Sequence, residues 1–237
     1  MRTPDHPPLA KSAQSARSAK STESAPCAET ADKPSTARAR GRPRAFDREA
    51  ALAQAMRLFW QKGFEATSVA DLTTAMGIAS PSLYAAFGSK EALYAEALDH
   101  YCTRYGDWGW KNFRQATTAR EAVQAWLMDC AAFLTGSVID VPLGCMVTLS
   151  GIGAAGHEQL CELTRTARSA PRTILRARLE QAVADGEIPS SADLDALARF
   201  VHVVQNGMSL QARDGASRAE LEAVVRVAMR SWDALSR

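Results

Sequence analysis

The sequence lacks the features that mark a membrane protein, a secreted disulfide-stabilised protein or a metalloprotein. No apolar run approaches the roughly 18 residues that a transmembrane helix requires. The polar, alanine-rich N-terminus contains no signal-peptide core. The five cysteines are scattered and form no CxxC pair, which argues against a disulfide framework and a zinc site. We therefore expect a cytoplasmic protein that holds no metal and no cofactor and has no membrane partner.

Motifs of the common enzyme classes are also missing. The chain has four histidines, no HExxH motif, no phosphate-binding glycine loop and no Ser/His/Asp arrangement at a recognised spacing. An all-helical enzyme is thus the weakest interpretation of the sequence, and we expect no enzymatic activity.

Composition and charge divide the 237 residues into unlike segments. Residues 1–40 are mainly Ala, Ser, Thr, Pro and Lys/Arg, and such a segment buries too little apolar surface to offset its ordering entropy. We expect it to be a disordered tail. Residues 40–90 carry seven Lys or Arg against four Asp or Glu, whereas residues 91–237 carry fifteen against eighteen. A basic segment attracts phosphate backbones, so residues 40–90 are the candidate for contact with nucleic acid.

Two short helices around a tight turn are predicted within residues 67–87. Thr67 or Ser68 can cap the first helix, because a hydroxyl accepts a hydrogen bond from a free amide of the first turn. Gly77 suits the left-handed position that ends a helix. This pattern is typical of a helix-turn-helix, whose second helix can enter a DNA major groove.

The second short helix is predicted to begin with Ser80 as its N-cap and Pro81 at its first position, where a missing N–H has no cost. Leu83 and Phe87 lie one turn apart and are expected to pack inward. The residues left facing outward are Ser82, Tyr84 and Ala85.

The rest of the chain is also predicted to be helical, with no convincing strand and no internal repeat. Apolar residues recur at helical spacing in every long segment. Pro171 is expected to kink one helix, and Ser217 with Glu220 to form a capping box at the start of the last. The further helices are expected over residues 47–62, 89–105, 119–135, 145–152, 157–185, 193–213 and 217–236. We predict an all-α fold of nine or ten helices.

Several short segments between residues 41 and 101 occur in a specific order and spacing. They are GRPR at 41–44, LFWQKGFEATS at 58–68, DL at 71–72, AMGI at 75–78 and SLYAAFGSKEAL at 82–93. In these segments the chain resembles the DNA-binding domain of the TetR family of transcriptional regulators. The resemblance implies an N-terminal three-helix helix-turn-helix domain over residues 41–88 and a C-terminal helical ligand-binding and dimerisation domain over residues 89–237. It also implies a homodimer that binds a near-palindromic DNA operator and is usually a repressor released by a small-molecule effector.

The resemblance also indicates which residues would contact DNA. Basic side chains on the arm before the first helix could reach phosphates or the minor groove. Tyr84 and Lys90 resemble phosphate contacts of the family, although core packing and a solvated charge are their alternatives. Ala85 and Ala86 replace larger residues found in many members, so specificity would depend more on DNA shape. The expected DNA contacts are Arg42, Arg44, Thr67, Ser80, Ser82, Tyr84 and Lys90.

Aromatic side chains concentrate just after the DNA-binding segment, where the family binds its effector. Aromatic walls suit an apolar or aromatic ligand, but ordinary core packing explains each residue equally well. The candidate pocket residues are Tyr105, Trp108, Trp110, Phe113, Trp126, Phe133, Met146 and Thr148, with Tyr101 beside them.

One cysteine supports a different trigger. Cys145 follows a loop rich in Pro and Gly at a predicted helix N-terminus, where the helix dipole lowers a thiol pKa. A regulator that senses oxidants or electrophiles through Cys145 is therefore the alternative to a ligand-released repressor. A buried, inert cysteine is the simpler interpretation.

The last two predicted helices are expected to pair with those of a second subunit in a four-helix bundle. The candidate interface residues are Val204, Met208, Val225 and Met229. The same apolar stripes would look identical if they packed only within the subunit.

Overall fold

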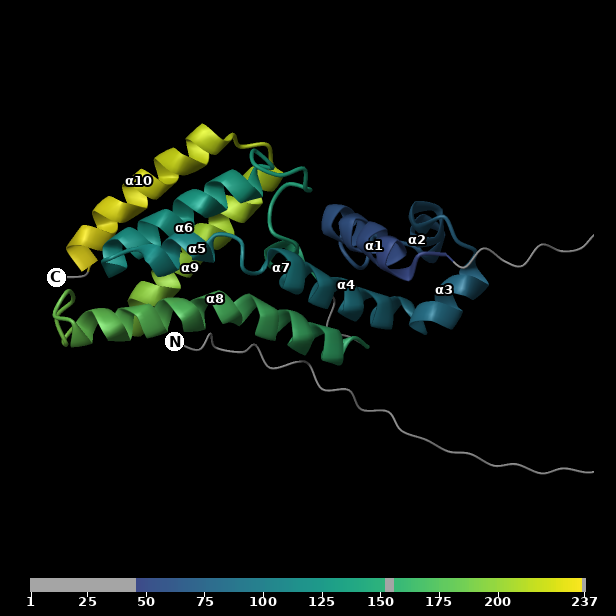
Figure 1. The fold of residues 1–237 in the computed structure, drawn as a ribbon, viewed down its shortest axis with the longest axis horizontal. Coiled ribbons are helices and arrows are strands. Elements are labelled where there is room, and N and C mark those ends of the chain that lie inside the picture. Colours follow the sequence, from purple (N-terminus) through teal and green to yellow (C-terminus); the bar gives the residue numbers. More distant parts are fainter. Residues whose placement is uncertain (1–45, 152–155, 236–237) are drawn as a thin grey trace, which may run out of the picture. The chain divides into compact units, whose positions relative to one another are not determined.

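The structure is a computed structural model that describes residues 46–151 and 156–235. Within these two ranges the chain forms ten α-helices and no strand, which confirms the all-α prediction (Figure 1). The predicted tail 1–40 and the arm residues Arg42 and Arg44 lie outside the described residues.

The first four helices are α1 (Arg48–Lys62), α2 (Val69–Met76), α3 (Ser80–Phe87) and α4 (Lys90–Tyr105). Helix α1 packs against both α2 and α4, and α3 connects α2 to α4 (Figure 1). Asp47 begins α1 as expected, because its carboxylate accepts the backbone N–H groups of Glu49 and Ala50.

Local sequence signals set the ends of α2. Ser68 is its N-cap and forms a capping box with Asp71, in which each side chain accepts the other residue's backbone N–H. Gly77 ends the helix in the left-handed conformation at φ 66°, as predicted.

The start of α3 corrects the sequence prediction by one residue. Ala79, not Ser80, is the N-cap, and Pro81 is the second helical residue. The Ala79 carbonyl accepts the N–H groups of Ser82 and Leu83 at 2.9 and 3.1 Å. Because the backbone alone makes this cap, the Ser80 side chain is left exposed to solvent.

The remaining helices are α5 (Trp110–Gln115), α6 (Ala119–Leu134), α7 (Met146–Leu149), α8 (Glu158–Ala184), α9 (Leu194–Arg213) and α10 (Arg218–Leu235). Helix α10 packs against α6 and α9, and α9 packs against α8 (Figure 1). Ser217 and Glu220 form the predicted capping box, and α8 continues through Pro171.

Two short elements differ from the prediction. Helix α5 was not predicted; it follows a turn at Gly109 with φ 77° and is anchored by buried Trp110 and Phe113. The helix expected over residues 145–152 shortens to the four residues of α7.

One continuous cluster of buried side chains extends from α1 to α10. The division into domains at residue 88 therefore stays a prediction. None of the helices in the described ranges is long and apolar enough to cross a membrane.

Candidate nucleic-acid interface

The outward face of α3 carries small and polar side chains above two apolar anchors. Leu83 and Phe87 are buried beneath the helix, as predicted. Tyr84 is 49% exposed, Ser80 and Ala85 are exposed, and Ser82 is half-buried. Tyr84 is thus the only long side chain among these outward residues.

Thr67 has a different environment from the one expected. Its side chain is fully buried, and its hydroxyl donates a hydrogen bond of 2.6 Å to the Gly63 carbonyl at the end of α1. The hydroxyl therefore holds the turn between α1 and α2 and is not presented to a phosphate. Ser68, the neighbouring residue, is the exposed one that caps α2.

An arginine that the sequence analysis missed fixes the far end of α3. The guanidinium of Arg48 pairs with Glu96 of α4 at 2.7 Å and donates to the Ala86 carbonyl at 3.3 Å. It also lies over the Phe87 ring, 4.4 Å from its centroid. Arg48 thus connects α1 to both α3 and α4. A spacing of 38 residues between Arg48 and Ala86 gives no local sequence signal for this contact.

Charged groups also fix α2 and the start of α4. Lys62 of α1 lies 3.1 Å from Asp71, whose pKa is lowered to about 2 by the backbone N–H of Ser68 and then by Lys62. The Lys90 ammonium lies 4.3 Å from the centroid of the Phe64 ring. Glu91 follows Lys90 in the sequence. Its pKa is lowered by a hydrogen bond from its own backbone N–H and then by one from the Ser89 side chain.

Comparison with known proteins identifies this arrangement. Residues 51–97 match the family model described as bacterial regulatory proteins, tetR family. The HTH-type transcriptional repressor ComR of Escherichia coli (strain K12) is 36% identical over 201 residues, which cover 84% of this chain and 94% of ComR. The chain belongs to the TetR family.

Two further relatives match different shares of the chain. The E. coli repressor BdcR is 54% identical over 65 residues, covering 27% of this chain and 33% of BdcR. A cysteine-substituted variant of the TetR family regulator CifR, solved in complex with 26-base-pair operator DNA, is 41% identical with a TM-score of 0.75. The match covers 81% of this chain and 100% of CifR. The chain is thus a helix-turn-helix transcriptional regulator, and the curated relatives named here are repressors.

The aromatic residues proposed for an effector pocket divide into two packed groups. In one group, Trp110 stacks on Trp126 with centroids 4.9 Å apart and meets the edge of Phe113 at 5.0 Å. In the other, Phe133 contacts Tyr105 and Trp108 at 5.8 and 5.1 Å.

The last two candidate pocket residues lie on α7 and make other contacts. Met146 is buried, and the Thr148 hydroxyl donates to the Asn206 side chain at 3.1 Å. In this conformation the candidate pocket residues contact side chains of the protein core.

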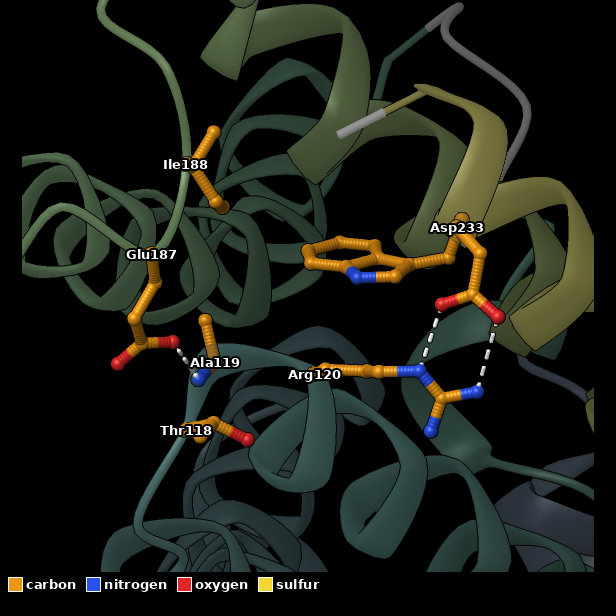
Figure 2. Close-up of a pocket in the computed structure, with 7 residues that line it drawn as sticks. Thr118, Ala119, Arg120, Glu187, Ile188 and Asp233 are labelled. Carbon is orange, nitrogen blue, oxygen red and sulfur yellow. Dashed lines mark hydrogen bonds and ion pairs between the residues drawn. The ribbon is translucent and has the colours of Figure 1, made fainter. Parts of the chain in front are cut away.

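A cavity of about 430 Å³ lies elsewhere, at the N-terminus of α6 (Figure 2). Arg120 pairs with Asp233 of α10 across it, and Glu187 accepts the Ala119 backbone N–H at 2.6 Å. The lining residues are Thr118, Ala119, Arg120, Glu187, Ile188, Trp232 and Asp233. None of the candidate effector residues lines this cavity.

Cys145 is the N-cap of α7 and is half-buried. The Tyr101 hydroxyl donates to its Sγ at 3.3 Å. Burial raises the pKa of Cys102 to about 12 and also raises that of Cys130, in both cases with a smaller contribution from Cys145. Cys102 and Cys130 are therefore protonated, weakly reactive thiols at neutral pH.

The predicted dimer-interface residues require a correction. Met208, Val225 and Met229 are buried inside the subunit, and Val204 is half-buried. Their stripes face the adjacent helices of the same chain, which was the alternative that periodicity could not exclude. The exposed large apolar residues in the described parts of α9 and α10 are Val203, Leu210, Val224 and Val227.

Proposed function

We propose that this TetR-family regulator is a repressor that binds a near-palindromic operator as a homodimer, with α3 of each subunit in a major groove. One observation carries the proposal: α3 presents a solvent-exposed polar face while its apolar face is anchored on α1 and α4. The 41% identity to CifR, which was solved with operator DNA, supports it.

The proposed contacts combine weak base readout with phosphate binding. Serine hydroxyls can bond to most bases, so Ser80 and Ser82 discriminate little. Tyr84 and Lys90 border the α3 face and are suited to phosphates. Arg42 and Arg44 would add contacts from the arm. Because Ala85 is small, the DNA can approach closely and its shape contributes to specificity.

The proposed dimer forms through the outward apolar face of α9 and α10. Val203 and Leu210 lie seven residues apart on α9, and Val224 and Val227 lie on α10, all with 45–61% of their surface exposed. Gly207 lies between the two α9 residues, and a Cβ added there would meet open space. Pairing with a second copy would bury this face as a four-helix bundle.

The proposed effector is a small apolar or aromatic molecule. It would enter the group formed by Tyr105, Trp108 and Phe133 by displacing ring contacts, since aromatic surfaces favour such a ligand. Its action would be to favour subunit positions that no longer match two successive major grooves.

The alternative trigger is modification of Cys145. Its supporting observation is that this half-buried thiol accepts a hydrogen bond of 3.3 Å from the Tyr101 hydroxyl of α4. Alkylation with iodoacetamide, compared between the wild type and Cys145→Ser, would separate the two triggers. Loss of operator binding in the wild type alone would favour the thiol mechanism.

Selection of bound fragments from a random DNA pool tests the proposed function. We expect an enriched inverted repeat, weaker binding by Tyr84→Phe and Lys90→Ala, and unchanged binding by Lys111→Ala, which removes an exposed lysine from α5. Binding should also weaken with salt. Absence of enrichment by the wild-type protein would contradict the proposal.

A further inference from the structure

Two adjacent residues, Gly144 and Cys145, connect three helices through their backbone groups. The Gly144 carbonyl accepts a buried hydrogen bond of 3.1 Å from the indole N–H of Trp60 on α1. The Gly144 N–H donates to the Leu134 carbonyl at the end of α6 at 2.8 Å. The Cys145 N–H donates to the Ser209 hydroxyl on α9, also at 2.8 Å. We call these two residues the 144–145 junction.

The junction fits closely against α9. Gly144 has φ 78°, a conformation that L side chains rarely adopt. A Cβ placed there would lie 2.8 Å from the Ser209 carbonyl oxygen and 2.5 Å from Leu149 Cδ1. Because backbone lies against backbone here, a displacement of α9 must move the junction with it or break its hydrogen bonds.

On the other side of the junction, Trp60 belongs to the helix that supports the helix-turn-helix. Its ring is almost completely buried and meets the edge of Tyr101 at 4.8 Å. Its carbonyl accepts a hydrogen bond of 2.9 Å from Arg213 at the end of α9. One turn earlier on α1, Arg57 donates to the Asp140 carbonyl at 2.9 Å, in the loop that leads to the junction.

We infer that the 144–145 junction couples the operator-binding helices to α9, with Trp60 and Ser209 acting as positioning residues. This inference rests on the proposed function, because it concerns how the fold regulates operator binding. Helix α9 carries half of the proposed dimer face. The junction therefore couples the arrangement of the two subunits to the position of α1. The Tyr101 hydroxyl, which bonds to Cys145 Sγ, adds α4 to the same point.

A double-variant cycle on the operator obtained by selection tests the inference. Trp60→Phe removes the indole N–H and keeps an aromatic ring, and Ser209→Ala removes the hydroxyl and keeps the helix. Loss of one buried hydrogen bond predicts that each variant weakens operator binding by about 5- to 30-fold. If both bonds serve one coupling, the double variant should be no more than about twofold weaker than the weaker single variant. Independent, multiplicative effects would overturn the inference.

The matched control pairs Trp60→Phe with Arg120→Gln. Arg120 makes a solvent-exposed ion pair with Asp233 between α6 and α10, away from the junction. Its effect on operator binding should be small and should multiply with that of Trp60→Phe. If Trp60→Phe does not fold, Arg57→Gln takes its place, because Arg57 is partly exposed and bonds to the adjoining loop.

Hydrogen exchange gives a measurement that needs no operator. In Ser209→Ala, amides in the second half of α1 and in α2 should exchange faster, although the substituted residue lies on α9. Unchanged exchange there would overturn the coupling, whatever the DNA result. Failure of the wild type to select any operator would instead contradict the proposed function, so the two failures are distinguishable.

Discussion

The helices α1–α3 and the helices α8–α10 are held in different ways. In α1–α3 short-range signals set each element: an Asp47 cap, a Ser68–Asp71 capping box and a left-handed Gly77. The Lys62–Asp71 ion pair then connects α1 to α2, and Arg48 connects α1 to α3 through the Ala86 carbonyl and to α4 through Glu96. In α8–α10 the helices are longer, and α9 and α10 are held mainly by buried apolar stripes. Both regions contribute to the same buried cluster, so the difference lies in the polar contacts that the first region adds between its short helices.

The largest expected effect comes from placing a charge on the outward face of α9 and α10. Val227→Glu should convert the proposed dimer to a monomer and weaken operator binding at least about 100-fold, because an unpaired charge would be buried on association. Light scattering and operator titration would measure both changes. Val138→Glu, at another exposed valine outside these helices, should change neither. A dimeric Val227→Glu would place the interface elsewhere.

A smaller effect is expected from the contact that fixes α3. Arg48→Met removes the bonds to Glu96 and Ala86 while keeping apolar contact with Phe87. Operator affinity should fall about tenfold, comparable to one lost base contact. The melting temperature should change little, since both partners of the ion pair are substantially exposed. If the melting temperature falls together with the operator affinity, Arg48 has a general structural role.

A substitution at Lys90 tests whether the ammonium group that lies over the Phe64 ring also contacts a DNA phosphate. Lys90→Ala should weaken operator binding several-fold and lower the slope of log affinity against log salt by about 1, as for one phosphate contact. Lys111→Ala serves as the matched control and should leave the slope unchanged. An unaltered slope in Lys90→Ala would assign Lys90 to packing on Phe64.

The smallest effect concerns pH. Asp71 has a pKa lowered to about 2 in the folded protein, against about 3.9 in an unfolded chain. Its contribution to the free energy of unfolding is therefore present above about pH 4 and is lost as the pH falls through 2. Asp71→Asn should flatten the pH dependence of unfolding in this interval, measured by urea titration. If Asp195→Asn flattens this pH dependence and Asp71→Asn does not, the effect comes from the ion pair between Arg176 of α8 and Asp195 of α9.

These two regions also differ in how far the sequence could predict them. Around α2 and α3 the relevant contacts span three or four residues, so Ser68, Gly77 and the buried Leu83 were predictable from local pattern. The cap at Ala79 was not predictable, because its backbone carbonyl takes the place of the Ser80 hydroxyl that the sequence pattern favours as the cap.

In α9 and α10 periodicity identified the apolar stripes but not what they face. Met208 and Val225 lie on the internal stripe, whereas Val203 and Val227 lie on the outward one. Only the packing of neighbouring helices separates the two. Arg48 and Trp60 were missed as positioning residues for a related reason: their partners lie 38 and 84 residues away.

The sparse outward face of α3 has a practical consequence for redesign. Ser80 and Ala85 place little bulk and no charge between the helix backbone and its surroundings. Longer side chains could therefore be introduced at both positions without disturbing the buried Leu83 and Phe87. Arginine and glutamine substitutions there are the first choice for redirecting this scaffold to new operator sequences, because their side chains make bidentate contacts with base edges.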